Sequence, residues 1–385
     1  MNFTGVNLDL QGLMKRTYAN LLYNSQFYKL LNRSFFEVGR TGTPIIEVVK
    51  QLDTKLNVRD NVEIAQGGIT NELATYNSIK VDLTELPMDY SFRVSPIVMG
   101  SGIERAIEGQ IQLKESQISK QIDIYGFGKL NTKITGPADG TMAYTDGQIT
   151  KWAPSNGTET IELINDLKAK LFDRDIYDGY LLGLRSDAYA YYVSSLTSVL
   201  KYETRAGIEG VDMGQIAEAY GVSAFQINAN VLKGANKEDT GVVGYFANEV
   251  GTVGDTFWSS MAQYNGNYPK YPGYFVVEGN VMFGAEVVRP EAVIKLVESV
   301  PTVDAGSFDA GTKGSSYTQT TAFSGTGVKK FEAAGLPAGL SLNATSGAVT
   351  GTPTEAGSFN VSIYGVDKYG NYSDAFSGTI TIAEA

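Results

Sequence analysis

The feature that most constrains this chain is a long amphipathic pattern, SGIERAIEGQIQLKESQISKQIDIYG, at residues 101–126. Its apolar residues recur at helical spacing with charged residues between them, and Ser101 can cap the first turn. About 24 helical residues span roughly 36 Å at 1.5 Å per residue, so the pattern predicts a rigid spine rather than an ordinary short helix. The apolar stripe consists of Ile103, Ile107, Ile111, Ile118, Ile122 and Tyr125.

Residues 44–98 alternate between apolar and polar side chains. The runs IKVDL at 79–83 and YSFRV at 90–94 place every second side chain on one face, which predicts long, two-faced β-strands. The sequence GGITNE marks a turn. Much of the segment is too polar to form its own core, and an isolated two-stranded ribbon is marginally stable. The ribbon therefore needs another surface, for which a neighbouring subunit is one candidate.

Weaker patterns occupy the rest of the first 300 residues. Residues 1–36 predict an extended start followed by a short amphipathic helix. The run TETIELINDLKAKLFD at 158–173 predicts a second helix, whose first-turn glutamates suit the helix dipole. We expect short mixed elements broken by glycine from about 200 to 275, and several β-strands from 275 to 298.

The last eighty residues differ in composition from the rest. Small and polar residues dominate PTVDAGSFDAGTKGSS at 301–316, which predicts a linker. Residues 317–385 then show short strand-like runs such as FNVSIYGV and GTITIA between turn signals, without a helical pattern. This pattern predicts a small β-sandwich.

Charge is distributed unevenly along the chain. The net charge is −11, which argues against a nucleic-acid binder held by basic charge over its whole surface. Residues 1–40 nevertheless carry five basic side chains against Asp9 and Glu37. The sequence therefore describes a small basic arm on an acidic body.

The chain contains neither cysteine nor histidine. Disulfides, zinc–thiolate sites, cysteine nucleophiles and imidazole ligands are excluded, as is Ser-His-Asp catalysis. Carboxylate, Lys, Tyr, Ser or Thr chemistry is all that remains, which weighs against an enzyme.

The N-terminus, MNFTGVNLDLQGLMKRTYANLLYN, lacks the cationic start and apolar run of a signal peptide. No run of about 18 apolar residues predicts a membrane span. We therefore expect a protein that is made, and at first kept, in a cytoplasm.

The C-terminal segment resembles the immunoglobulin-like repeats of bacterial surface proteins and phage structural proteins. The resemblance rests on a Leu-Pro-x-Gly-Leu run at Leu336–Leu340, a Gly-Thr-Pro turn at Gly347–Pro353 and an Ala-Gly-aromatic strand start at Ala356–Phe359. These motifs are specific for the fold and only weakly informative about a ligand.

The first 300 residues resemble the major capsid protein of tailed bacteriophages, which has the Hong Kong 97-type fold. Three segments carry the resemblance: Glu115–Leu130 is similar to the end of the family's spine helix, Tyr180–Leu196 to the strand and helix that enter the axial domain, and Gly284–Glu298 to the closing strand. Each motif is short, and the order of the motifs along the chain is the main support for the resemblance.

The resemblance implies an α+β capsid fold, built from an N-terminal arm, an extended β loop, a peripheral domain and an axial domain, followed by an all-β immunoglobulin-like sandwich. The implied division is 1–36 for the arm, 37–98 for the loop, 99–186 with 276–300 for the peripheral domain, 187–275 for the axial domain, 301–316 for a linker and 317–385 for the sandwich.

The implied function is that of a major capsid protein, not an enzyme. Hexamers and pentamers of the chain would form an icosahedral head in the host cytoplasm, with the sandwich as an outward decoration. The implied partners are other copies of the chain, scaffolding and portal proteins, packaged double-stranded DNA bound non-specifically, and surface glycans at the sandwich. No membrane, cofactor, metal or catalytic residue is expected.

Two alternatives remain open. An encapsulin-type nanocompartment shell has the same fold but encloses enzyme cargo, and the appended sandwich argues against it. A secreted adhesin or glycan-binding protein could use the same C-terminal module. The lack of a signal sequence and of histidines, and the presence of only two tryptophans, Trp152 and Trp258, count against this second alternative.

Several local motifs are similar to known metal-binding or phosphate-binding loops. DRDIYDG at 173–179 approaches a calcium loop, but Asp178 is one place late and position twelve is Leu184 instead of glutamate, which favours solvated acids at a helix end. Neither GFGKL at 126–130 nor GTVGDT at 251–256 has the spacing of a phosphate loop.

Two further features concern contacts. The aromatic run YNGNYPKYPGYF at 264–275 could stack on sugars or bases, and we favour a subunit contact because tyrosine is enriched in interfaces. The basic arm could meet packaged DNA or acidic neighbouring subunits. Some capsids of this family crosslink a lysine to an asparagine, but neither Lys50 nor Lys55 aligns with that motif, so no crosslink is carried over.

Overall fold

The structure, a computed structural model, describes residues 10–34, 45–51, 76–95, 103–134, 149–203, 221–233, 239–265, 267–368 and 370–384. The chain divides into two compact units. Unit 1 comprises Met1–Ile122 with Thr252–Val288, and unit 2 comprises Asp123–Gly251 with Arg289–Ala385.

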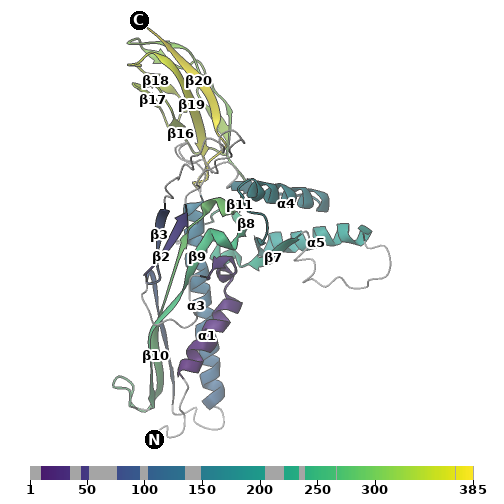
Figure 1. Cartoon of the computed structure of the whole chain (residues 1–385), viewed down its shortest axis with the longest axis vertical. Helices are drawn as coiled ribbons and strands as arrows, with labels where there is room; N and C mark the ends of the chain where they lie inside the picture. The colour runs from purple at the N-terminus through teal and green to yellow at the C-terminus, as the bar shows by residue number, and fades with distance from the viewer. Residues whose placement is uncertain are drawn as a thin grey trace, which may run out of the picture. The chain divides into compact units, whose positions relative to one another are not determined.

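Unit 1 is organised by a long antiparallel hairpin of β9 (Thr252–Asn265) and β10 (Phe275–Val287). Strand β4 (Leu86–Val94) pairs antiparallel with the outer side of β10, and β1 (Leu31–Asn32) pairs parallel with β9. The sheet order is therefore β1-β9-β10-β4, which brings together residues as distant in the sequence as Leu31 and Thr252. Figure 1 shows β9 and β10 side by side in the long hairpin.

A second hairpin joins β2 (Ile45–Gln51) to β3 (Tyr76–Asp82). Its apolar side chains pack with residues from the ends of the long hairpin. Gly284 lies against β3, and a Cβ there would come within 1.8 Å of the Asp82 carbonyl oxygen, so this crossing requires glycine. The expected alternating strands of 44–98 are present wherever that segment is described. The shared cluster consists of Val48, Val81, Leu83, Val253 and Val288.

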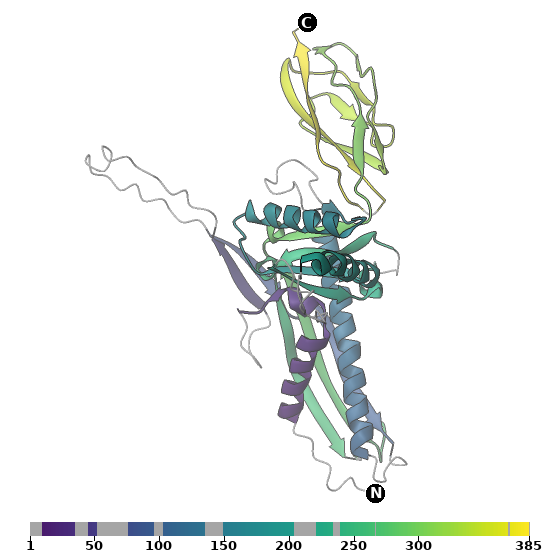
Figure 2. The same cartoon turned by 90° about the vertical axis from the view of Figure 1, so that its right-hand side faces the viewer.

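Unit 1 also contains the N-terminal helical segment and the part of the spine helix up to Ile122. The N-terminal segment forms α1 (Leu10–Asn24) and the short helix η1 (Phe27–Leu30). The expected spine is α3 (Ile103–Lys133), and Figure 2 shows α1 lying alongside its first half. The helix extends beyond the predicted end at 126 despite two glycines, because Phe127 and Leu130 are buried. The predicted cap, Ser101, lies outside the described residues.

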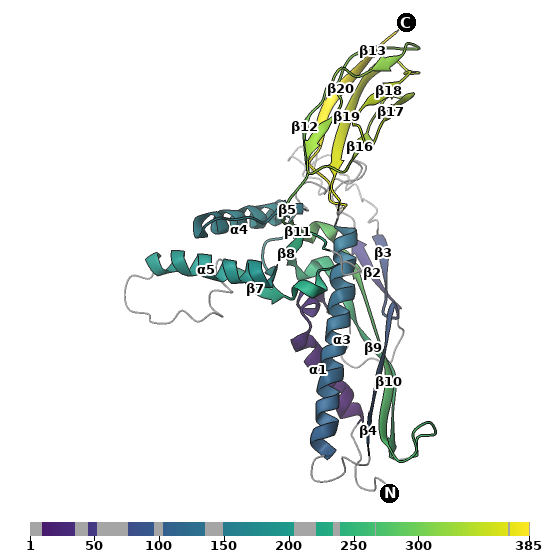
Figure 3. The same cartoon turned by 180° about the vertical axis from the view of Figure 1, so that it is seen from behind.

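Unit 2 contains a five-stranded sheet of order β5-β11-β8-β6-β7. Two helices, α4 (Gly157–Phe172) and α5 (Ser186–Glu203), pack on each other through a contact between Thr160 and Ser195 (Figure 3). Asn156 caps α4 by accepting a hydrogen bond from the Glu159 N–H at 2.9 Å. The strands are β5 (Ile149–Lys151), β6 (Tyr180–Arg185), β7 (Val222–Ile227), β8 (Val242–Asn248) and β11 (Val293–Val297). Three short helices lie beside the strands in the chain: η4 (Ala229–Val231) follows β7, η5 (Glu249–Gly251) follows β8 and η6 (Pro290–Ala292) precedes β11.

The sheet of unit 2 crosses the expected boundary at 186/187. Strand β6 lies before that boundary, yet it pairs parallel with β7 and antiparallel with β8, which both lie after it. Strand β9, expected in the axial domain, instead pairs with β10. The peripheral and axial divisions therefore remain a proposal, and the strand pairing groups 180–185 with 222–227 and 242–248.

The C-terminal module is a β-sandwich, as the sequence predicts. One sheet has the order β13-β20-β19-β16 and another the order β14-β18-β17, while β12 pairs with β15. Phe323, Val361 and Ile363 are among the residues that fill its core. Its strands are β12 (Thr302–Ala305), β13 (Gly311–Thr312), β14 (Tyr317–Thr318), β15 (Ser324–Thr326), β16 (Lys330–Ala334), β17 (Leu340–Leu342), β18 (Val349–Gly351), β19 (Gly357–Val366) and β20 (Phe376–Ala383).

The prediction of a linker at 301–316 is wrong, because this segment belongs to the sandwich. Strand β12 pairs with β15, and β13 pairs with β20. Phe308 stacks on Phe376 with ring centroids 5.8 Å apart and contacts Phe323 at 5.3 Å. A single aromatic residue between glycines and serines gives no periodic signal, so composition alone misled the assignment.

We expect Phe308→Ala to lower the free energy of unfolding of the sandwich by about 2 kcal/mol, because it removes a partly buried ring that packs against the aromatic core. Differential scanning calorimetry of the full chain should show a lower midpoint for one transition. Ser315→Ala, at an exposed position of the same segment, is the control. An unchanged midpoint in Phe308→Ala would restore the linker interpretation.

Candidate functional surfaces

A buried carboxylate on α3 holds the N-terminal helix. Glu115 is only 2% exposed, and it accepts hydrogen bonds from Thr17 Oγ1 at 2.9 Å and from Asn20 Nδ2 at 2.7 Å. Glu115 occupies a position of the apolar stripe, four residues after Ile111 and three before Ile118. A charged residue at such a position is a signal that the sequence analysis missed. A buried carboxylate needs these donors because leaving it unpaired is costly.

A second buried carboxylate, Asp255 on β9, holds the same segment further along. Asp255 is 4% exposed and accepts hydrogen bonds from Tyr18 Oη at 2.9 Å and from Tyr28 Oη at 3.3 Å. Burial raises the pKa of Asp255, and burial together with the Asp255 charge raises the pKa of Tyr18 to about 12. The high pKa of Tyr18 keeps its hydroxyl protonated, and so able to donate to Asp255, throughout the neutral pH range.

Apolar and backbone contacts complete this attachment. Phe27 and Tyr28 pack on Phe283 with ring centroids 6.3 and 5.7 Å away. Thr252 Oγ1 donates to the carbonyl of Leu30, directly beside the β1–β9 pairing. The described arm is thus an integral part of unit 1, and its basic residues Lys15 and Arg16 remain exposed.

The predicted aromatic run forms a ladder at the tip of the β9–β10 hairpin. The guanidinium carbon of Arg93, on β4, lies 4.2 Å from the centroid of the Tyr271 ring. The guanidinium therefore covers one face of that ring. Tyr268 Oη donates to Glu278 Oε2 at 2.9 Å. Successive rings are separated by 4.8, 6.0 and 6.2 Å between centroids, in the order Tyr264, Tyr268, Tyr271 and Tyr274. Pre-packed Tyr and Arg side chains of this kind are typical of protein interfaces.

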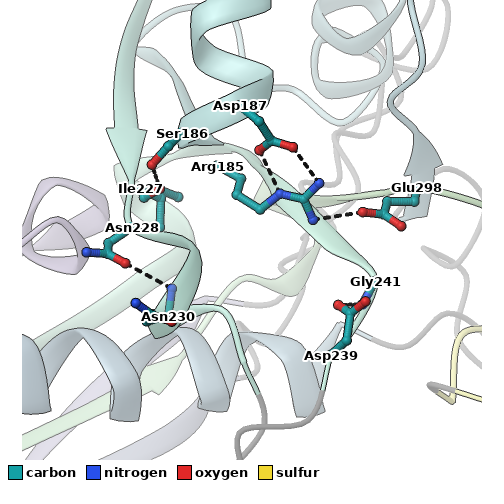
Figure 4. A network of polar contacts seen from close by, with 9 residues as sticks. All are labelled: Arg185, Ser186, Asp187, Ile227, Asn228, Asn230, Asp239, Gly241 and Glu298. Atoms are coloured by element: carbon teal, nitrogen blue, oxygen red, sulfur yellow. Dashed lines mark hydrogen bonds and ion pairs between the residues drawn. The ribbon is translucent and has the colours of Figure 1, made fainter.

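Unit 2 contains an ion-pair network where β6 passes into α5 (Figure 4). The Arg185 guanidinium binds both carboxylate oxygens of Asp187, at 2.7 and 2.8 Å, and Glu298 Oε1 at 2.8 Å. The guanidinium lowers the pKa of Asp187 to about 2. Because Asp187 is largely exposed, we expect the pair to fix the junction geometry more than to raise stability.

Lys295 is a fully buried lysine in β11, an interior strand of the sheet that lies between β5 and β8. Its Nζ donates to the backbone oxygen of Asn131 at 3.3 Å and to Asn131 Oδ1 at 3.2 Å. Burial lowers the pKa of Lys295 to about 8. The run AVIKLV, with one lysine inside an apolar strand, is the sequence signal for this site.

The carboxylates of the turn at 173–179 do not converge on one point. Tyr177 Oη donates to Asp175 Oδ1 at 2.6 Å, while Asp173 and Asp178 are exposed. Among the described residues no group of three acidic side chains could hold a metal ion. The turn therefore has the geometry of a solvated helix end.

The remaining sequence motifs have structural positions. Residues 126–130 lie inside α3. Residues 251–256 run from the last residue of η5 into β9, which contains Asp255. Lys50 lies in β2, where its side chain is not described, and Lys55 lies outside the described residues. No helix in the described part of the chain has the length and apolar character needed to cross a membrane.

Comparison with known proteins gives two results. A family model described as "Putative Ig domain" matches residues 294–383, so the C-terminal module is immunoglobulin-like. No curated protein sequence matches the chain.

The chain is also similar to solved structures of phages. One is from Mycobacterium phage Che8, with 13% identity, a TM-score of 0.49 and coverage of 71% of this chain and 90% of that chain. The capsid of Cyanophage P-SCSP1u has 10% identity, a TM-score of 0.47 and coverage of 67% and 84%. The mature capsid of bacteriophage PhiM1 has 12% identity, a TM-score of 0.47 and coverage of 71% and 87%.

The raised pKa of Asp255 predicts a pH dependence. A group whose pKa is raised on folding contributes stability that is fully present below its unfolded pKa, about 3.9. That stability is lost as the pH rises through the folded value. We therefore expect the urea-unfolding midpoint of the wild type to fall relative to that of Asp255→Asn as the pH rises from about 4 into the neutral range.

The matched control for this measurement is Asp89→Asn, at an exposed position on β4 of the same unit. Its midpoint should follow that of the wild type at each pH. A constant difference between the wild type and Asp255→Asn across this range would contradict the assignment.

Proposed function

We propose that this chain is the major capsid protein of a tailed bacteriophage, and that its role is structural rather than catalytic. Copies would assemble into hexamers and pentamers of an icosahedral head around double-stranded DNA. Scaffolding and portal proteins are the further partners that this role implies. The virion, assembled in a bacterial cytoplasm, would be its location.

The observation that carries the proposal is the series of elements in chain order. An N-terminal helix, a β-hairpin, a 31-residue helix, an α/β unit and a long closing hairpin follow one another as the sequence resemblance implies. The immunoglobulin-like module comes last. An extended helix alongside a narrow sheet leaves much surface outside a single core, which suits a protein stabilised by large interfaces.

Three described features support assembly as the mechanism. The β2–β3 hairpin presents Ile45, which is 49% exposed, at the start of β2. The tyrosine ladder with Arg93 offers a packed contact surface at the hairpin tip. The net charge of −11 would keep free subunits apart until nucleation or scaffolding overcomes repulsion.

The arm and the module would have separate roles. Residues 10–34 carry four basic side chains and no acidic one, which suits contact with DNA or with acidic neighbouring subunits. The immunoglobulin-like module would decorate the outside of the shell and bind bacterial or mucosal surface glycans weakly. The encapsulin-type shell and the secreted adhesin are alternatives that no described feature favours.

The direct test is to purify the full chain and measure its assembly by sedimentation velocity and cryo-electron microscopy, with and without a crowding agent. We expect closed shells in which each subunit carries an outer knob formed by the C-terminal module. A chain that stays monomeric under all conditions, including co-expression with genes adjacent to its own, would contradict the proposal.

A deletion separates the module from the shell. Because β11 ends at Val297 and the module begins at β12, removing residues 302–385 leaves the sheet of unit 2 complete. We expect the truncated chain to form shells of the same diameter without knobs. Loss of assembly, with the far-ultraviolet circular dichroism of a folded body retained, would show that the module is part of the shell.

A further inference from the structure

The end of α4 exposes an unusual pair of aromatic side chains. Phe172 is 56% exposed and Tyr177 is 59% exposed, and their rings meet edge to face with centroids 4.9 Å apart. Large apolar side chains in mutual contact at a surface indicate an interaction site more than scattered single ones do. We call Phe172–Asp178 the aromatic turn.

The aromatic turn is held rigidly. Ile176 is buried beneath it, and its N–H donates to the Leu171 carbonyl at 3.1 Å, which closes the end of the helix. Asp175 has a φ of 61°, and among the described residues it is the one non-glycine residue with a positive φ. Its carboxylate accepts the Tyr177 hydroxyl at 2.6 Å. A rigid surface loses little conformational entropy on binding.

The charge of the aromatic turn points to a basic partner. Asp173, Asp175 and Asp178 are exposed at the carboxyl end of α4, where the helix dipole already places partial negative charge. Arg174 lies among them, but its Nη1 donates to the carbonyl of Glu291 at 3.0 Å. Within the described part of the chain no lysine or arginine forms an ion pair with these three carboxylates. This charge pattern excludes DNA, which is also negative, as the occupant.

We propose that the aromatic turn binds the N-terminal segment of a second copy of this chain. That segment, residues 10–34, has no acidic side chain and exposes the adjacent basic pair Lys15 and Arg16 on α1. The two surfaces are therefore complementary in charge, with the aromatic pair as the apolar centre of the contact. The inference rests on the proposed assembly function and identifies one of its contacts.

A crosslinking experiment tests the contact in the full chain. Tyr177 is replaced by photoreactive p-benzoylphenylalanine, shells are assembled from a mixture of ordinary and ¹⁵N-labelled subunits, and crosslinked peptides are identified by mass spectrometry. We expect mixed-isotope crosslinks between the aromatic turn and peptides from residues 10–34. Crosslinks confined to one copy, or to any other segment or protein, would overturn the proposal.

Variants provide an independent measurement. The double variant Phe172→Ser/Tyr177→Ser should raise the subunit concentration for half-assembly at least tenfold, while its thermal midpoint stays within a few degrees because both side chains are mostly exposed. Leu113→Ser, at a leucine of α3 that is 50% exposed, is the matched control and should change that concentration less than twofold.

Charge reversal tests the partner segment. Lys15→Glu/Arg16→Glu should weaken assembly, and adding Asp173→Lys/Asp178→Lys should restore it at least partly. If the wild type assembles and the combined variant does not recover assembly, the proposed contact is wrong while the proposed function stands. A wild-type chain that never assembles would contradict the proposed function itself, so the two failures are distinguishable.

Discussion

Antiparallel pairing of β9 with β10 is the constraint on which the rest of unit 1 depends. The hairpin provides one edge for β4 and the other for β1, and it carries the buried carboxylate that receives the tyrosines of the N-terminal segment. Two glycines allow the backbones of neighbouring strands to approach each other closely. A Cβ at Gly254 would come within 2.5 Å of the Gly284 carbonyl oxygen, and a Cβ at Gly284 would meet the backbone of β3. Side chains at either position would force the strands apart.

Buried charge fixes the positions of elements that hydrophobic burial alone would leave loosely specified. Apolar contact is non-directional, whereas Glu115 accepts hydrogen bonds only when Thr17 and Asn20 face it. Within unit 2, Lys295 is similarly satisfied by both oxygens of Asn131. In each case, removing one partner would leave a desolvated polar group. A helix or strand that shifted along its axis or rotated about it would lose these hydrogen bonds, so the observed arrangement is favoured.

The sequence predicted the elements with strong periodicity and missed what depends on long-range pairing. The apolar stripe of α3, the alternation in β3 and β4 and the turn-marked strands of the sandwich are local patterns, and the structure contains them. The pairing of β4 with β10, almost 190 residues apart, and the parallel pairing of β13 with β20 have no local signal. Glu115 and Lys295 interrupt apolar patterns and could have been identified; Asp255 and the core role of Phe308 could not, since neither disturbs a period.

The strand register of the sandwich places its two ends far apart. The chain arrives at β12, where Val303 packs beside Gly365 near the end of β19, whereas β20 finishes beside Gly357 at the start of β19. Eight residue steps of extended strand separate Gly357 from Gly365, about 26 Å at 3.3 Å per residue. A label, epitope or enzyme fused beyond β20 would therefore be presented at the end of the sandwich opposite its junction with the body. The same separation makes circular permutation of the module unfavourable unless a long connecting peptide bridges the two ends.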